Sequence, residues 1–361
     1  MRTRSLSLSL ALGLIALAAT ASAHPGSGIV VTTTGRVFFV ETGNIDIKIS
    51  GNLWEIDETG ALKSLKRQGA HWLALDTEGT FAGADFDRWF ARRTAPRLDW
   101  VPVPGGNAGL IHADGMPLVV HRDGNLYYAS RNLEITRLTP AGMTTLLVPN
   151  LRLITDKLGG IKGLASGRED TLFATCPGAV LQIKLDGTGS ALVHPVSLED
   201  CGKQPTADLS EPGLRGLAVD DHGTVFAAAT SCGCVVKVTP DGRVLPILAA
   251  ESPWLPTGVA LHGSDLYVLE YFHANSDDRR RQWRPRVRKL GPDGQVKTLA
   301  TLGGSEPTGP PAAPRPVPAP LPSPDGRDTR PDAAPRSVPQ AAIRSRPLWG
   351  GAGSSMRVIS D

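Results

Sequence analysis

A strand-and-turn phrase that recurs along the chain constrains the fold more than any other feature of this sequence. It is clearest between Leu214 and Ala249, where three short runs rich in Val and Ala are separated by turn signals and followed by a fourth run. The turn signals are Asp221-His222-Gly223 and Asp241-Gly242, and the pattern is typical of four strands joined by tight turns. Each unit of this kind predicts one small antiparallel sheet.

Similar phrases occur along most of the chain, about 45 residues apart. The six copies begin at Gly28, His71, Met116, Lys162, Leu214 and Thr257. A single four-stranded sheet cannot bury both of its faces until neighbouring sheets stack on it, so this period favours propeller blades. We therefore expect an all-β fold, a six-bladed β-propeller of four-stranded antiparallel blades, within residues 24–303.

The two ends of the chain differ from the repeats in composition. Residues 1–23 carry Arg2 and Arg4 ahead of an apolar run and end in small residues, a pattern typical of a secretory signal peptide. We expect a secreted or periplasmic protein. Residues 304–361 are rich in Pro and Arg, and they predict a disordered tail because they cannot bury enough apolar surface to offset chain entropy. Such a tail acts either as a spacer or as a ligand for a partner.

Several classes of function find no support in the sequence. The net charge of +3 does not indicate a nucleic-acid-binding protein, and no run after residue 23 approaches the ~20 apolar residues of a membrane span. The chain has no G-x-S-x-G elbow, no H-E-x-x-H and no phosphate loop. We expect neither a nucleic-acid partner nor a membrane span. His112 and His121 are candidate acid-base groups, although His121 falls within an expected strand.

Four cysteines in an exported chain favour disulfides. They are Cys176, Cys201, Cys232 and Cys234. Propeller topology brings them to neighbouring positions on one face, which predicts two cross-links in which Cys176 and Cys201 each bond to one of the other two. A bridge within the Cys232-Gly233-Cys234 segment would be strained. The alternative is a thiolate metal site, which the C-x-C spacing also allows.

Three phrases of the repeats, RGLAVDDHGTVFAAA, LPTGVALHGSDLYVLEY and DGNLYYAS, carry a resemblance to known proteins. The blades resemble NHL repeats and the related gluconolactonase (senescence marker protein) family of six-bladed propellers. The resemblance covers Gly28 to about Gly303. It implies, for members of the hydrolase family, a central divalent metal held by Glu, Asn and Asp side chains near the ends of the inner strands.

This chain departs from the family at the positions that the resemblance assigns to the metal ligands. Those positions hold Ser27, His71, Met116, Lys162 and Arg215 in blades one to five, and Thr257 in blade six. A divalent cation about 6 Å from a lysine or arginine would be repelled by on the order of 5 kcal/mol at an effective dielectric constant near 20. We therefore expect no metal and no cofactor; a divalent cation (Ca or Zn) belongs only to the hydrolase alternative.

Carboxylates lie near these positions in the expected topology. Glu41, Asp85 and Glu270 occupy matching ends of the second strand of a blade, and Asp114 precedes the third blade. The simpler interpretation is that they accept hydrogen bonds from the next turn. Under the hydrolase alternative they would supply the polar chemistry.

Arginines gather in two enlarged loops, 86–96 and 271–285, which we expect on one face of the propeller. We call this face the top face; the long connection 188–213 is expected there as well. The arginines are Arg88, Arg92, Arg93 and Arg97 in or beside the first loop, and Arg279, Arg280, Arg281, Arg284, Arg286 and Arg288 in and after the second. Aromatic residues interleave with them: Trp89, Phe90, Trp254 and Trp283. Guanidinium groups beside aromatic rings favour an anionic ligand, whereas pairing with Asp277 and Asp278 would make them a solvated loop.

We therefore expect an exported NHL-like propeller that binds a ligand or partner of anionic character on its top face. The partner would be an anionic small molecule, an acidic glycan or a protein. The candidate ligand-binding residues are His71, Lys162, Arg215, Thr257, His112, Asp114, Trp254 and Glu270. One alternative is a gluconolactonase-like, metal-dependent hydrolase with altered metal ligands, and another is an interaction scaffold with no small-molecule ligand.

Overall fold

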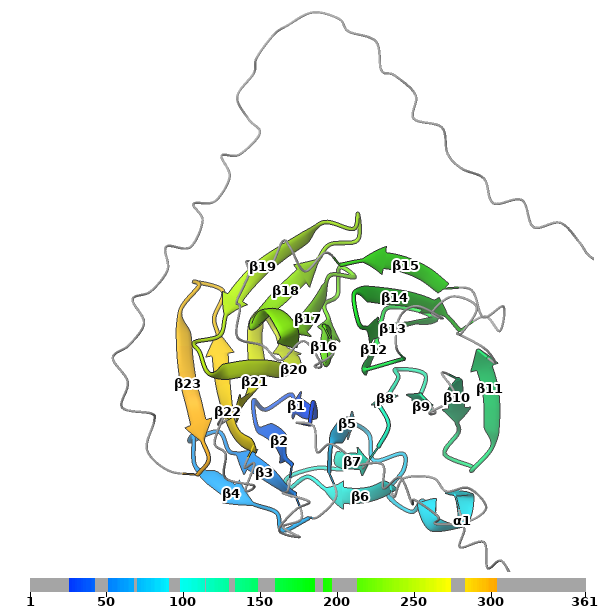
Figure 1. Ribbon diagram of the computed structural model, residues 1–361. Helices are drawn as coiled ribbons and strands as arrows, with labels where there is room; N and C mark the ends of the chain where they lie inside the picture. Colours follow the sequence, from blue (N-terminus) through cyan, green and yellow to red (C-terminus); the bar gives the residue numbers. More distant parts are fainter. Residues whose placement is uncertain are drawn as a thin grey trace, which may run out of the picture. The chain divides into compact units, whose positions relative to one another are not determined.

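The computed structural model describes residues 26–42, 51–67, 70–90, 98–113, 115–129, 134–148, 160–185, 191–196, 213–273 and 283–303. These residues form six antiparallel sheets around a central channel (Figure 1). Each sheet is one blade, and its first strand lies next to the channel. The prediction of an all-β, six-bladed propeller is confirmed.

In five of the six blades, four strands lie side by side in the order in which they occur in the chain, from the channel outward. Blade one contains β1 (Ile29–Val31), β2 (Val37–Glu41), β3 (Asn52–Ile56) and β4 (Leu62–Ser64). Blade three contains β8 (Leu118–Val120), β9 (Leu126–Ala129), β10 (Ile135–Leu138) and β11 (Thr144–Val148). Blade four contains β12 (Gly163–Ser166), β13 (Thr171–Cys176), β14 (Ala179–Lys184) and β15 (Ala191–Pro195).

The last two blades follow the same plan. Blade five contains β16 (Leu217–Val219), β17 (Val225–Ala229), β18 (Cys234–Val238) and β19 (Val244–Ala249), with a short 3-10 helix at Thr230–Cys232. Blade six contains β20 (Trp254–His262), β21 (Asp265–His273), β22 (Trp283–Leu290) and β23 (Val296–Thr301). Each of these blades is built from one continuous stretch of chain, and none of the strands that the structure describes is shared between the first blade and the last.

Blade two departs from the expected order. Its described strands β5 (Trp72–Asp76), β6 (Leu98–Pro102) and β7 (Gly109–Ala113) form a sheet in the order β5-β7-β6. The chain leaves β5 through turns and the one-turn helix α1 (Phe86–Phe90), forms the outer strand β6, and returns beside β5 as β7.

A buried carboxylate explains why no strand forms directly after β5. Asp76 is fully buried and accepts hydrogen bonds from the N–H groups of Thr80 and Phe81, at 3.0 and 2.9 Å, and from the indole of Trp100 at 3.0 Å. These bonds hold residues 77–81 in tight turns. The expectation that Asp85 ends a second strand is therefore wrong, because Asp85 lies between these turns and α1.

The tight turns within the blades follow from their sequence. Between β16 and β17, the Asp220 carboxylate accepts hydrogen bonds from the N–H groups of His222 and Thr224, each at 2.8 Å. Gly223 follows with φ +78°, a conformation that favours glycine because it has no Cβ. The D-x-x-G phrase therefore predicts the turn for a physical reason.

Apolar side chains fill the spaces between neighbouring blades. Phe173 and Val180 of blade four, for example, pack with Ala227 and Val236 of blade five. Because both faces of a sheet are covered in this way, the core is distributed around the ring rather than gathered in one place.

Two hydroxyl groups close the ring where blade six meets blade one. The Thr257 hydroxyl donates to the carbonyl oxygen of Gly26 at 2.8 Å. The buried Tyr271 hydroxyl donates to the carbonyl oxygen of Val40 at 2.5 Å and accepts from the N–H of Thr42 at 3.3 Å. We call this boundary the seam, because none of the described strands belongs to both blades.

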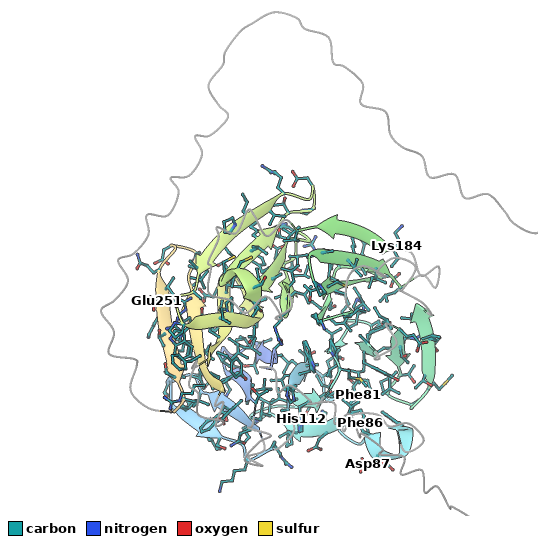
Figure 2. The ribbon with its side chains drawn as sticks, viewed as in Figure 1. Phe81, Phe86, Asp87, His112, Lys184 and Glu251 are labelled. Carbon is teal, nitrogen blue, oxygen red and sulfur yellow. The ribbon has the colours of Figure 1, made fainter. Side chains whose placement is uncertain are left out.

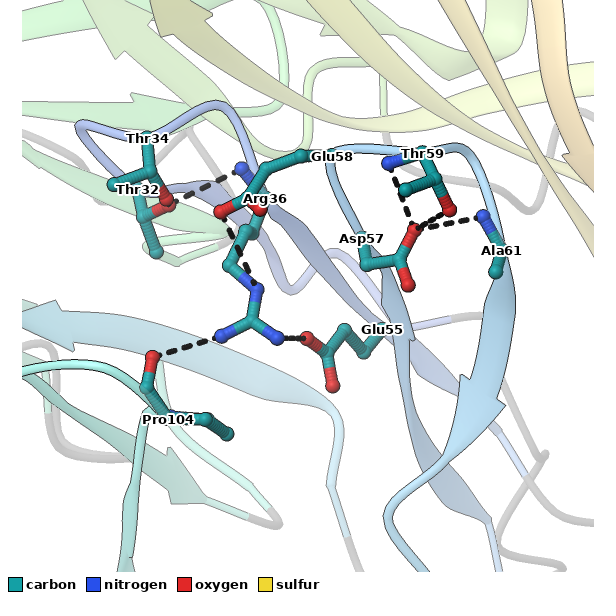
Figure 3. A network of polar contacts seen from close by, with 9 residues as sticks. All are labelled: Thr32, Thr34, Arg36, Glu55, Asp57, Glu58, Thr59, Ala61 and Pro104. Carbon is teal, nitrogen blue, oxygen red and sulfur yellow. Dashed lines mark hydrogen bonds and ion pairs between the residues drawn. The ribbon is translucent and has the colours of Figure 1, made fainter.

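A polar network fastens blade one to blade two on the side of the first turns (Figure 3). The Arg36 guanidinium lies 2.5 Å from the Glu55 carboxylate, which is almost fully buried, and donates to the carbonyl oxygen of Pro104 in blade two at 2.8 Å. The exposed carboxylate of Glu58 lies 3.9 Å from the same guanidinium.

Several predictions concern residues outside the described part of the chain. These are the signal peptide at 1–23, the tail at 304–361, Asp114, Cys201, and the greater part of the two arginine loops and of the connection 188–213. Among the described residues, no helix combines the length and the apolar character needed to cross a membrane.

Candidate functional site at the channel mouth

The first strands of the six blades line a central channel with a volume of about 270 Å³. Ser27, His71, Met116, Lys162 and Arg215 each lie one or two residues before the first strand of their blade. They therefore surround one end of the channel, which we call the channel mouth. The equivalence of these positions, predicted from the repeat, is confirmed by the strands that follow them.

Backbone hydrogen bonds join neighbouring positions around the channel mouth. The N–H groups of Ser27 and Gly28 both donate to the carbonyl oxygen of His71 at 3.0 Å. On the other side of the ring, the N–H of Gly216 donates to the carbonyl oxygen of Thr257 at 2.9 Å. These bonds fix the spacing of the first strands and hence the width of the mouth.

The backbones of Lys162 in blade four and Arg215 in blade five lie close together. The N–H of Lys162 donates to the carbonyl oxygen of Thr175 at 2.7 Å, and the Thr175 hydroxyl donates to the carbonyl oxygen of Arg215. A Cβ atom at Gly163 would lie only 2.7 Å from that same carbonyl oxygen. The two strands can approach this closely because glycine follows Lys162 and because Thr175 bridges the blades.

The charges of these two side chains are felt by buried groups on either side. Burial raises the pKa of the Cys176 thiol to about 12, and the nearby Lys162 ammonium acts in the opposite direction. Burial also raises the pKa of the Tyr271 hydroxyl at the seam, where the Arg215 guanidinium acts to lower it and the Glu41 carboxylate to raise it. The charge of Lys162 thus acts on Cys176, and that of Arg215 acts on Tyr271.

Thr257 takes the sixth position of this ring, but its side chain is fully buried. Its hydroxyl donates to the carbonyl oxygen of Gly26, with a longer contact of 3.4 Å to that of Leu269. In the structure Thr257 therefore closes the seam.

Trp254 and Glu270, two further candidates, come together at a different place, the boundary between blades five and six. The Glu270 carboxylate is fully buried and accepts hydrogen bonds from Arg286 Nε at 2.5 Å and from Arg288 Nη2. The Arg286 guanidinium lies over the Trp254 indole, 4.3 Å from the ring centre. We call these four residues the arginine cluster.

The arginine cluster corrects the place expected for Arg286 and Arg288. Both residues lie within β22 and are almost fully buried, so they do not belong to an exposed loop. A signal for this was present in the sequence, because Arg284, Arg286 and Arg288 alternate with Pro285 and Val287, as expected for a strand with one polar face.

His112 lies one strand outward from the channel, beside β5 of blade two. It sits in β7 and is buried, with its Nε2 atom 3.5 Å from the Asp99 carboxylate, which also lies 3.7 Å from the Arg67 guanidinium. Burial lowers the pKa of His112, and Asp99 acts to raise it. His121, the other candidate acid-base group, directly follows β8 and lies 3.2 Å from the Asp123 carboxylate.

The described cysteines lie in two different cores. Cys176 is a free thiol and packs between blades three and four, whereas Cys232 and Cys234 pack between blades four and five. The blade-four sheet separates them, so a bridge from Cys176 to either of the other two is not formed. A bond from Cys201 to Cys232 or Cys234 stays a prediction, because Cys201 lies outside the described residues.

Of the carboxylates named in the sequence analysis, Glu41 also has a structural partner. Glu41 ends β2, as predicted, and accepts a hydrogen bond from the Trp54 indole at 2.8 Å. Within the described segments, no three side chains of His, Cys, Asp or Glu gather in an arrangement that could hold a metal ion.

The fold and the site together define a six-bladed β-propeller with cationic side chains at one end of its channel. Neither a protein-family model nor a curated protein matches the sequence. Solved structures of other propellers are similar in fold. Virginiamycin B lyase from Staphylococcus aureus is 12% identical, with a TM-score of 0.42 over 77% of this chain and 85% of that chain.

Two further solved structures show a comparable similarity. The calcium-binding protein regucalcin from Agrobacterium tumefaciens is 14% identical, with a TM-score of 0.42 over 70% of this chain and 84% of that chain. A luciferin-regenerating enzyme is also 14% identical, with a TM-score of 0.46 over 78% of this chain and 94% of that chain. The six-bladed propeller that the resemblance of the repeats implied is shown by the blades of the structure itself.

Proposed function

We propose that this propeller is a binding protein whose ligand is an anion held at the channel mouth by Lys162 and Arg215. The observation that carries the proposal is that two cationic residues, in adjacent blades, lie one or two residues before strands that line an open channel of about 270 Å³ and have backbones held close together. Charge-assisted hydrogen bonds from an ammonium or guanidinium group contribute about 1.5–3 kcal/mol each. Two such contacts suffice for selective recognition of an acidic ligand.

The channel mouth favours a ligand over a purely structural use of these cations. Whereas Lys184 and Arg243, for example, are exposed and belong to outer strands and turns, Lys162 and Arg215 lie one or two residues before strands that line the channel. Here they begin at backbone positions fixed by Thr175 and Gly163 beside the channel. The candidates His71 and Ser27 border the same opening and would add polar contacts.

A binding panel of uronates, phosphosugars and acidic oligosaccharides tests the proposal. Titration calorimetry on the mature chain should find a ligand whose affinity falls by roughly a hundredfold or more in Lys162→Ala/Arg215→Ala. The matched control is Lys184→Ala/Arg243→Ala, which removes the same charge from exposed positions on outer strands and turns. Equal loss in both double variants would indicate a general charge effect and would contradict the proposed site.

Two further measurements separate loss of binding from loss of folding and from catalysis. Arg215→Lys keeps the charge and should retain most of the affinity, while thermal unfolding reports whether each variant is folded. Metal analysis of the purified protein addresses the hydrolase alternative, because a stoichiometric divalent ion at Lys162 and Arg215 would overturn the anion site. Sequencing of the secreted protein should begin at His24 if the predicted export is correct.

A further inference from the structure

The arginine cluster interrupts an apolar boundary between two blades. Most of the contact between blades five and six is apolar and includes Ala228, Val235, Leu248, Val259 and Val268. Glu270 and the two arginines lie on the same face of blade six, since Glu270 pairs with Arg286 and Val268 pairs with Arg288 in the register of β21 and β22. A charged layer thus replaces the apolar one toward the connection from β19 to β20.

Among the residues that the structure describes, this charged layer carries more positive than negative charge. One carboxylate, Glu270 at 0% exposure, faces two guanidinium groups, Arg286 at 2% and Arg288 at 5%. Ion clusters buried this deeply are costly unless their charges and hydrogen bonds are matched. Two buried N–H groups, Arg286 Nη2 and Arg288 Nε, have no hydrogen-bond acceptor in the part of the chain that the structure describes.

A second negative charge is supplied to the arginine cluster by an exposed residue, Glu251. Glu251, labelled in Figure 2, lies in the connection from β19 to β20 with 71% of its side chain exposed. Its carboxylate is 3.5 Å from Arg286 Nη1. An exposed glutamate loses side-chain entropy when it is held at one place, and surface pairs of this kind contribute little to stability. Moving the Glu251 carboxylate away from Arg286 into solvent therefore costs little free energy.

We propose that the arginine cluster is an anion-binding site for a carboxylate group, and that Glu251 holds this site when no ligand is bound. Arg286 offers its guanidinium edge to the incoming group, Arg288 adds a second buried donor, and the Trp254 indole covers one face of Arg286. A planar carboxylate suits a guanidinium fork, and a single negative charge neutralises the excess of the cluster. A dianion such as phosphate would instead leave surplus negative charge in a buried layer.

The site lies between blades five and six and involves neither Lys162 nor Arg215, so it stands independently of the channel mouth. Its test uses sodium acetate as the probe, with thermal unfolding as the readout. Glu251→Gln removes the competing carboxylate and keeps the size of the side chain. For a dissociation constant of about 20 mM, 100 mM acetate should raise the Tm of this variant by roughly 2–4 °C relative to chloride at equal ionic strength.

The parent protein should respond less than half as strongly, because its own Glu251 competes. The matched control is Glu58→Gln, which removes another exposed carboxylate that lies near an arginine, Arg36. This control should behave as the parent does. Lys162→Ala/Arg215→Ala in the Glu251→Gln background should keep the acetate response, which separates this site from the channel mouth.

Two arginine variants complete the experiment. Arg286→Lys in the Glu251→Gln background keeps a positive charge but loses the fork and the planar stacking, so the acetate response should fall at least threefold. Arg288→Lys, which leaves Arg286 and Trp254 in place, should reduce the response less and serves if Arg286→Lys does not fold. The proposal is overturned if Glu251→Gln responds no more than the parent, if Glu58→Gln responds equally, or if phosphate at equal ionic strength stabilises as well as acetate does.

Discussion

Replacing Glu270 by glutamine should be among the most destabilising single changes in the propeller. The glutamine keeps the shape of the side chain but removes the charge that Arg286 and Arg288 share. Two charge-assisted hydrogen bonds of about 1.5–3 kcal/mol each are weakened, and two guanidinium groups stay buried with the exposed Glu251 as the remaining carboxylate near Arg286 and the Ala249 carbonyl as an acceptor for Arg288, within the described ranges of the chain. Breaking a buried ion cluster of this kind costs about 3–5 kcal/mol, so we expect the Tm to fall by roughly 6–20 °C.

A graded comparison tests whether burial and charge are the cause. Glu55→Gln breaks a second buried carboxylate, but its arginine is partly exposed and retains Pro104 and Glu58 as neighbours. We expect about half the loss seen for Glu270→Gln. In the triple variant Glu270→Leu/Arg286→Met/Arg288→Met the whole cluster becomes apolar, and its stability should lie within about 2 kcal/mol of the parent.

Urea unfolding followed by intrinsic tryptophan fluorescence gives these free energies of unfolding, with equal slopes as the check that the same transition is compared. A loss below about 1 kcal/mol for Glu270→Gln would refute the reasoning. The same holds if the triple variant is as unstable as the single one, because the loss would then come from packing rather than from an unbalanced charge.

Three other predictions address the seam and two buried titratable groups. Thr257→Val removes the hydroxyl that donates to Gly26 and should cost about 1–3 kcal/mol in urea unfolding, with hydrogen exchange accelerated first in blades one and six; uniform acceleration in all blades would contradict it. Burial lowers the pKa of His112, so the unfolded state binds the proton more readily than the native state does. The free energy of unfolding should therefore fall as the pH drops below about 6.5. His112→Gln should flatten this dependence between about pH 6.5 and 5, whereas an unchanged profile would point to other groups. The Cys176 thiol, with its pKa raised to about 12, should react with a disulfide reagent at pH 8 far more slowly in the native than in the unfolded protein, and a rapid native reaction would show that it is accessible.

Much of the fold could be predicted because the repeat has a direct physical meaning. Turn phrases such as Asp220 to Gly223 specify both the carboxylate that caps a turn and the glycine that allows a positive φ. The same counting placed Lys162 and Arg215 before inner strands, where the structure has them. Blade two could not be predicted in this way, since the Asp76 carboxylate folds the following residues into turns through contacts that include Trp100, which lies far along the chain.

The contacts of the site residues were predicted less well where they depend on which face of a strand a side chain occupies. Adjacent residues of a strand point to opposite faces, so Thr175 reaches Arg215 of blade five while Cys176 packs toward blade three. A displacement of one residue thus separates a bridging contact from a buried thiol. For Arg286, the count of positive charges in a loop concealed the alternation that marks a strand and its buried partner Glu270.

The seam also sets the order in which this molecule can be completed. Its two closing hydroxyls, on Thr257 and Tyr271, are each 231 residues from their acceptors in blade one. During synthesis from the N-terminus, blade one must therefore wait with one face uncovered until blade six has emerged, and contacts of such long range form slowly. Blades four and five, which carry Lys162 and Arg215, are consecutive in the chain and can pack together without this delay. The channel is enclosed on all sides only after blade six has packed against blade one.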